Sequence, residues 1–242
     1  MVDFKEDLRH PLVKRWWQRP GRIILLIIAG IFLSFFIWAG LVFVDAYQKI
    51  KSGEYDPRLF GNSSSPEYDM SRIMDQTDPS YGPVDAPIQI VEFGDFMCPR
   101  CLQSFNVLQE VRKRYPDKIR LSWRNLPIVT DYSYKVALAG ECAAAQGQFW
   151  PFHDYMFEKQ AEINQFNIAE LATDIGMNES AFQTCYDKEL FLYKLIDDGN
   201  LAEELEISGT PTFFINGRKV PGSVTIEAWS QIINQVLSQV NE

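Results

Sequence analysis

The stretch from Glu92 to Cys101 constrains this chain more than any other. An apolar run over residues 88–93 is typical of a short buried strand. Two cysteines at C-x-x-C spacing, Cys98 and Cys101, follow it, and an amphipathic segment over residues 102–115 predicts a helix. This order places the first sulfur at a helix N-terminus, where unpaired N–H groups and the helix dipole favour a thiolate. The stretch therefore predicts a redox-active cysteine.

Residues 23–44 are 22 consecutive uncharged and mostly apolar residues, which predict a transmembrane helix. Their length of about 33 Å is enough to cross a hydrocarbon core of about 30 Å. The tail before them, residues 1–22, is basic and carries Trp16 and Trp17, so the positive-inside rule places it in the cytoplasm and residues 45–242 on the extracytoplasmic or periplasmic side. The alternative is a cleaved signal peptide, for which the apolar run is long and no small-x-small site follows.

The extracytoplasmic part is acidic. It holds 17 of the 23 Lys and Arg residues and 29 of the 32 Asp and Glu residues, a formal charge of −12. This charge argues against binding to nucleic acid or anionic lipid. All four cysteines lie in this part, in a compartment where disulfides persist.

The sequence also predicts the order of secondary-structure elements after the membrane segment. Residues 45–77 have linker composition, rich in Gly, Pro and Ser, although part of 68–76 could pair as an edge strand. Residues 118–123 alternate as a second strand, and 131–207 have helical spacing with a long helix expected over 189–206. A hairpin with a type I′ turn at Asn216-Gly217 follows, and a one-faced helix with Thr225 as N-cap ends the chain.

This order resembles the α/β thioredoxin fold, and its helical insertion makes it similar to the DsbA family of extracytoplasmic thiol-disulfide oxidoreductases. More narrowly, the chain resembles membrane-anchored members of this family that carry a second cysteine pair. The motifs that carry the resemblance are Glu92 six residues before Cys98-Pro99-x-Cys101, Cys142 followed by Gln146-Gly147-x-Phe149-Trp150, and Gly209-Thr210-Pro211 before the hairpin. The implied organisation is a basic tail (1–22), a transmembrane helix (23–44), a linker (45–77), the two halves of the thioredoxin fold (78–130 and 208–242) and the helical insertion (131–207).

Cys98 is expected to attack and Cys101 to resolve, because thiol–disulfide exchange needs a second thiol close to the mixed disulfide. A zinc site would need two further ligands, and the sequence offers only His10 and a lone His153, so no metal is expected. No cofactor is expected beyond the redox-active disulfide. Between the cysteines lies Pro99-Arg100, where the best-known oxidants of the family have Pro-His. A positive Arg100 would lower the Cys98 pKa and make the disulfide more oxidising, whereas a solvated Arg100 would have little effect.

The resemblance assigns Pro211 as a cis-proline whose preceding residue, Thr210, pairs with a substrate strand. Glu92 has two interpretations. In the first, which the resemblance implies, Glu92 lies beneath the active site, has a pKa raised by burial and exchanges a proton with Cys101. In the second, it lies at the strand end and either faces water or pairs with Arg124. Two apolar residues of the turn are candidate contacts for unfolded chains, namely Phe96 and Met97.

The second cysteine pair, Cys142 and Cys185, lies on the apolar sides of its helices. A structural disulfide, which would close a loop of about 44 residues and add ~4 kcal/mol, is the leading interpretation. Two free buried thiols are the alternative. The pair lacks the strand–turn–helix setting of a catalytic pair.

The resemblance therefore implies an anchored oxidase of cysteine pairs in secreted or membrane proteins, reoxidised by a quinone-linked membrane partner of the DsbB or VKOR type. The alternatives are a reductase or isomerase on the same scaffold, and a non-catalytic, chaperone-like binding module.

Overall fold

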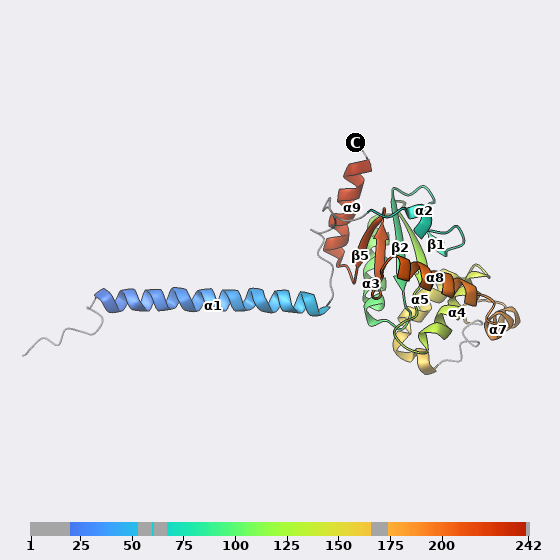
Figure 1. Cartoon of the computed structure of the whole chain (residues 1–242), viewed down its shortest axis with the longest axis horizontal. Coiled ribbons are helices and arrows are strands. Elements are labelled where there is room, and N and C mark those ends of the chain that lie inside the picture. Colours follow the sequence, from blue (N-terminus) through green and yellow to red (C-terminus); the bar gives the residue numbers. More distant parts are fainter. Residues whose placement is uncertain (1–19, 53–59, 61–66, 166–173, 241–242) are drawn as a thin grey trace, which may run out of the picture. The chain divides into compact units, whose positions relative to one another are not determined.

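A computed structural model describes residues 20–52, 60, 67–165 and 174–240, and the chain divides into two units, Met1–Ser52 and Gly53–Glu242 (Figure 1). The first unit contains α1 (Pro20–Ser52). Within it, Ile24–Asp45 is long and apolar enough to cross a membrane. Most of the predicted basic tail, with Trp16 and Trp17, lies outside the described residues.

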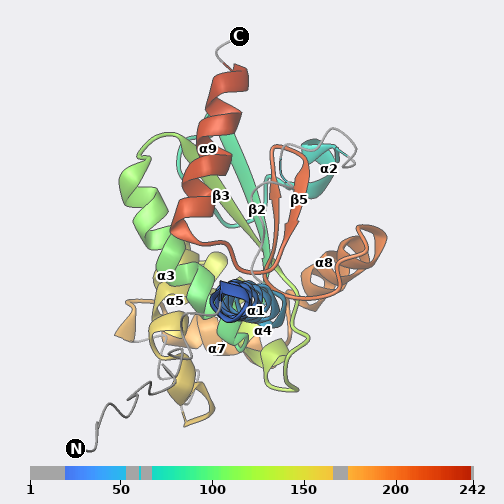
Figure 2. The same ribbon diagram turned by 90° about the vertical axis from the view of Figure 1, so that its left-hand side faces the viewer.

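The second unit is built on a five-stranded sheet in the order β1-β3-β2-β4-β5 (Figure 2). Its strands are β1 (Ser80–Tyr81), β2 (Ile88–Gly94), β3 (Ile119–Asn125), β4 (Thr212–Ile215) and β5 (Arg218–Pro221). β2 and β3 run parallel, and the other neighbours are antiparallel. Because β2 is central and covered on both faces, it is apolar almost throughout. Asn216 and Gly217 both have positive φ, 46° and 84°, as the predicted hairpin turn requires.

Helices cover both faces of this sheet. On one face, α3 (Pro99–Arg114) and α9 (Ile226–Val240) pack together over Ile88 and Ile90. On the other face, α2 (Met70–Ile73) and α8 (Leu192–Glu204) pack over Val91 and Phe93. Since side chains alternate along a strand, Glu92 belongs to the face covered by α3 and α9.

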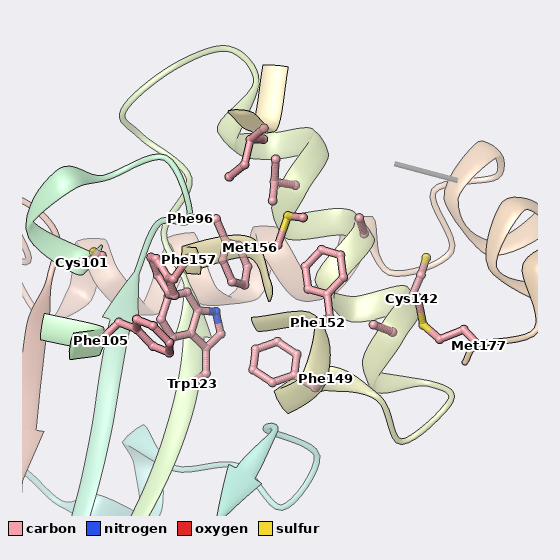
Figure 3. Packing of buried hydrophobic residues seen from close by; sticks show 14 of the residues in the cluster. Phe96, Cys101, Phe105, Trp123, Cys142, Phe149, Phe152, Met156, Phe157 and Met177 are labelled. Atoms are coloured by element: carbon pink, nitrogen blue, oxygen red, sulfur yellow. The ribbon is translucent and has the colours of Figure 1, made fainter. Parts of the chain in front are cut away.

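The helical insertion comprises α4 (Ser133–Ala144), α5 (Phe149–Glu158), the 3-10 helix η3 (Gln160–Gln165), α7 (Glu179–Asp187) and α8. Its core is continuous with the start of α3, since Phe96 and Cys101 share a buried cluster with Phe152 (Figure 3). The predicted α/β thioredoxin-like fold with a helical insertion is confirmed. The predicted start of the long helix at residue 189 is wrong, because Glu189 has a φ of 48° and the helix begins only at Leu192.

The predicted linker, 45–77, is too long at both ends. Its first residues, 45–52, continue α1. Its last residues pack on the sheet: Ile73 is 1% exposed, and the Tyr68 N–H donates to Gly217 O at 2.7 Å. The segment considered as an edge strand forms α2 in part and makes one isolated bridge, Glu67 with Arg218, while Tyr68, Met70 and Ile73 pack on the face of β2 and β4.

Candidate active site

The C-x-x-C pair lies where β2 passes into α3. Cys98 is the N-cap residue of α3, and its N–H donates to Asp95 O at 3.0 Å to close the turn after the strand. Pro99 is the first residue of the helix. Its fixed φ suits the helix there, and its lack of an N–H costs no intrahelical hydrogen bond. Cys98 is 5% exposed and Cys101 0%, and both are free thiols. Pro99 and Arg100 are exposed at the rim of the site.

The two sulfurs differ in acidity. A hydrogen bond from the Cys101 side chain lowers the pKa of Cys98 to about 6, and Thr210 and the backbone N–H groups of Cys101 and Arg100 act in the same direction against the opposing effect of burial. Burial raises the pKa of Cys101 well above its usual value, and a hydrogen bond to Cys98 and the charge of Glu92 add to this. At neutral pH the pair therefore holds one thiolate, on Cys98, and one thiol, on Cys101.

The loop before β4 lies against this thiolate. The Thr210–Pro211 peptide bond is cis, and Cys98 Sγ lies 3.3 Å from Thr210 O, to which it donates when it is protonated. Thr212 Oγ1 donates to Gly209 O at 2.7 Å, and the Gly222 N–H donates to Pro211 O at 2.8 Å, so both sides of the cis bond are held. The backbone of Thr210 is thereby fixed beside the sulfur of Cys98.

Glu92 is buried, 2% exposed, between Trp123 of β3 and Phe213 of β4. Burial raises the pKa of Glu92 to about 8, and the nearby Cys98 charge adds to the rise. The interpretation that pairs Glu92 with Arg124 is wrong, because Arg124 bonds elsewhere. Its guanidinium lies 2.7 Å from Asp198 Oδ1 and 3.2 Å from Asp78 Oδ2 on the opposite side of the sheet.

Phe96 does not contact solvent, so its expected role as a substrate contact is wrong. It is 1% exposed and lies in an aromatic cluster with Trp123, at a ring distance of 5.0 Å, and Phe157, at 5.4 Å (Figure 3). Gly94 makes room for this packing, because a Cβ there would meet the Trp123 ring at 2.2 Å. Met97 is partly exposed and remains available at the surface of the turn.

Asp95 is a site residue that the sequence analysis missed. Its buried carboxylate accepts hydrogen bonds from the N–H groups of Met97 at 2.8 Å and of Ile128 and Val129 at 2.9 Å each. It therefore ties the active-site turn to the loop after β3. An Asp between a strand and a helix start is a common signal of such side-chain-to-backbone bonding.

Gln160, the first residue of η3, was also missed. Its Nε2 donates to Phe96 O at 2.8 Å and to Cys98 O at 3.0 Å. No sequence pattern connects a residue of the helical insertion with a carbonyl 62 positions earlier.

Cys142 and Cys185 form a disulfide that joins α4 to α7, with Cα atoms 5.8 Å apart. Both sulfurs lie in the buried cluster of the insertion. The bonded pair is thus distinct from Cys98 and Cys101, which are free thiols of the same cluster. Among the residues that the structure describes, no group of three or more His, Cys, Asp or Glu is arranged to hold a metal ion.

Comparison with known proteins agrees with this geometry. The thioredoxin family profile matches residues 74–235. BdbD from Bacillus subtilis, in its oxidised crystal structure, is 25% identical and superposes with a TM-score of 0.63 over 72% of this chain and 97% of BdbD. The alpha-DsbA1 structure from Wolbachia pipientis is 21% identical, with a TM-score of 0.61 over 69% of this chain and 94% of that one.

The similar curated proteins carry a different name. The Na(+)/H(+) antiporter NhaA 1 of Salinispora arenicola is 34% identical over 159 residues, which are 65% of this chain and 24% of the antiporter. This chain thus spans about a quarter of the length of such relatives. The name antiporter refers to those longer proteins. By the extent of the family match and by its fold, this chain belongs to the thioredoxin family, with the DsbA and BdbD type of thiol-disulfide oxidoreductase as its structural neighbours.

Proposed function

We propose that this chain is a membrane-anchored extracytoplasmic thiol-disulfide oxidoreductase that oxidises cysteine pairs in secreted or membrane proteins. One observation carries the proposal: an acidic, slightly exposed Cys98 thiol and a buried, weakly acidic Cys101 thiol lie beside the cis Thr210–Pro211 bond. A redox pair in which one thiol attacks and the other resolves needs this difference in acidity between its two thiols.

The reaction starts from the Cys98–Cys101 disulfide. A client thiolate attacks Cys98 Sγ, the bond between the two enzyme sulfurs breaks, and Cys101 leaves and takes up a proton. A second client thiolate then attacks the client sulfur of the mixed disulfide, and Cys98 leaves as a thiolate. The client loses two electrons and gains a disulfide, and the enzyme pair is reduced to dithiol.

The protein groups have separate tasks in this sequence. Glu92, whose raised pKa keeps it protonated at neutral pH, supplies the proton that Cys101 takes up. The backbone of Thr210 pairs with the client strand as an added β-strand would, and the partly exposed Met97 contacts its apolar side chains. The hydrogen bonds that stabilise the Cys98 thiolate also stabilise the reduced enzyme, which makes the disulfide a better oxidant.

The site requires no cofactor beyond its own disulfide, but each turnover leaves it reduced. A quinone-linked membrane protein of the DsbB or VKOR type would reoxidise it. The apolar segment of α1 and the basic tail before it support an anchor with a cytoplasmic N-terminus, which would keep the domain near such a partner.

Trapping in membranes tests catalysis. In Cys101→Ser the Cys98 thiolate still attacks a client disulfide, but the thiol that would attack Cys98 and release the client is missing, so Cys98-linked client adducts should accumulate and disappear on reduction. Cys98→Ser is the matched control and should trap nothing. If Cys101→Ser traps no client while Cys98→Ser keeps full function, the chain is a non-catalytic binding module and the proposal is wrong.

A further inference from the structure

We infer that Gln160 is a positioning residue for the redox pair, holding the turn before α3 in the shape that makes Cys98 reactive. The inference rests on the proposed function for its purpose, and on two hydrogen bonds for its geometry. The Gln160 amide nitrogen donates both of its protons to the turn, one to Phe96 O at 2.8 Å and one to Cys98 O at 3.0 Å.

These two carbonyls define the turn that presents the sulfur. Cys98 O belongs to the peptide unit between Cys98 and Pro99, and it also accepts the first hydrogen bond of α3, from the Leu102 N–H at 3.2 Å. Phe96 O lies two residues earlier. A single amide that binds both carbonyls fixes the Phe96–Met97 and Cys98–Pro99 peptide planes and leaves the turn between them little rotational freedom.

Gln160 is itself held in place. It follows α5 with one intervening residue, and α5 supplies Phe152 and Phe157, whose rings lie 5.6 and 5.4 Å from the ring of Phe96. The same segment therefore contacts Phe96 twice, by packing on its ring (Figure 3) and by a hydrogen bond to its carbonyl. A half-buried glutamine anchored in this way is a fixed part of the site.

The effect of Gln160 on the reactivity of Cys98 depends on the groups that stabilise the Cys98 thiolate. The N–H groups of Arg100 and Cys101 are among the donors to Cys98 Sγ, and they belong to the two peptide units that directly follow the Cys98–Pro99 plane, whose oxygen Gln160 holds. Without the amide, the plane can rotate and those hydrogen bonds weaken. The thiolate then becomes less stable, and the reduced enzyme with it.

The experiment uses the full chain in detergent, in the dithiol form. The rate at which iodoacetamide alkylates Cys98 is measured against pH by peptide mass spectrometry, and the equilibrium with glutathione is measured on the same samples. The variants are Gln160→Met, which removes both donors at similar volume, and Gln160→Glu, which keeps the shape of the side chain and decides the matter if the Met variant does not fold.

Gln146→Met is the matched control. Gln146 is also a half-buried glutamine of the insertion, and its amide bonds a backbone, accepting from the Asn178 N–H at 2.8 Å and donating to Asn178 O at 3.3 Å. Its loss should loosen the insertion without touching the turn before α3.

We expect both Gln160 variants to raise the alkylation midpoint of Cys98 by about one pH unit. The glutathione equilibrium should move about threefold to tenfold toward the enzyme disulfide. Gln146→Met should leave both values at those of the parent. Unchanged midpoints in the folded Gln160 variants, or an equal shift in Gln146→Met, would overturn the inference. If the parent protein does not exchange with glutathione at all, the proposed function fails, while the alkylation midpoints still decide the role of Gln160.

Discussion

The sulfur of Cys98 lies 3.3 Å from the carbonyl oxygen of Thr210, although the two residues are 112 positions apart. Cys98 begins the helix that follows the central strand, and Thr210 precedes the strand that pairs antiparallel with it. The sulfur that attacks and the backbone that receives a client therefore meet only when both halves of the fold are assembled. The contribution of each group at this contact to reactivity and stability can be measured separately.

Alkylation should separate the two free thiols. We expect iodoacetamide to modify Cys98 with a pH midpoint near 6 and to leave Cys101 unmodified through pH 8, because hydrogen bonds stabilise the first thiolate and burial opposes the second. Peptide mass spectrometry after timed labelling gives both rates. Equal reactivity of the two cysteines, or a Cys98 midpoint near that of an ordinary thiol, would contradict the assignment of roles.

Glu92→Gln should change how stability depends on pH. Folding raises the Glu92 pKa from 4.5 to about 8, so the native state binds more protons than the unfolded state across that range and loses stability as pH rises through it. Gln cannot titrate. We expect the unfolding free energy of the variant, relative to wild type, to increase by up to about 4 kcal/mol between pH 4.5 and pH 8.

Urea unfolding of the reduced protein, followed by tryptophan fluorescence at several pH values, measures this difference. A difference between variant and wild type that does not change with pH would show that Glu92 is ionised in the folded protein.

The Arg100 side chain should matter less than its backbone. The groups that lower the Cys98 pKa include the Arg100 N–H, which any residue except proline supplies. Arg100 is exposed at the rim of the site, where water screens its charge. We expect Arg100→Gln to move the alkylation midpoint of Cys98 by less than about half a unit. A rise of a full unit would instead make the guanidinium charge the main determinant of the thiolate.

The buried ion pairs beside β3 should dominate the stability of the domain. Asp198 accepts from Arg124 Nη1 at 2.7 Å and from the Asn125 N–H at 2.9 Å. Asp198→Ala leaves a buried cation short of a partner and should cost about 3 to 5 kcal/mol in urea unfolding. Glu204 lies on the same helix as Asp198 and forms an exposed ion pair with Arg72 of α2, so Glu204→Ala should cost at most about 1 kcal/mol. Equal costs would mean that Asp198 is not needed to neutralise Arg124.

The fold was accessible from the sequence because its signals are local. The apolar run before Cys98, the Asn216-Gly217 turn and the N-cap at Thr225 each specify a short element, and the Thr225 hydroxyl does accept from the Ala228 N–H at 3.2 Å. The order of such elements was sufficient to predict a thioredoxin-like sheet with a helical insertion.

The parts of the site that the sequence did not predict depend on tertiary packing. Nothing in the sequence distinguishes Phe96 from an exposed phenylalanine of the turn. Only its packing against Trp123 in the structure shows that it is buried. Gln160 and Arg124 have partners far along the chain, and no periodicity encodes such pairs. Residues 67–77 resemble a linker, yet Ile73 is buried in the domain.

The reduction potential of the Cys98–Cys101 pair tests the central claim most directly. It is obtained by equilibrating the full chain with defined ratios of reduced and oxidised glutathione and quantifying the thiols. A stabilised Cys98 thiolate predicts an oxidising potential, above about −200 mV. A value near or below about −270 mV, that of a reductant such as thioredoxin, would contradict the proposal that this chain introduces disulfides into its clients.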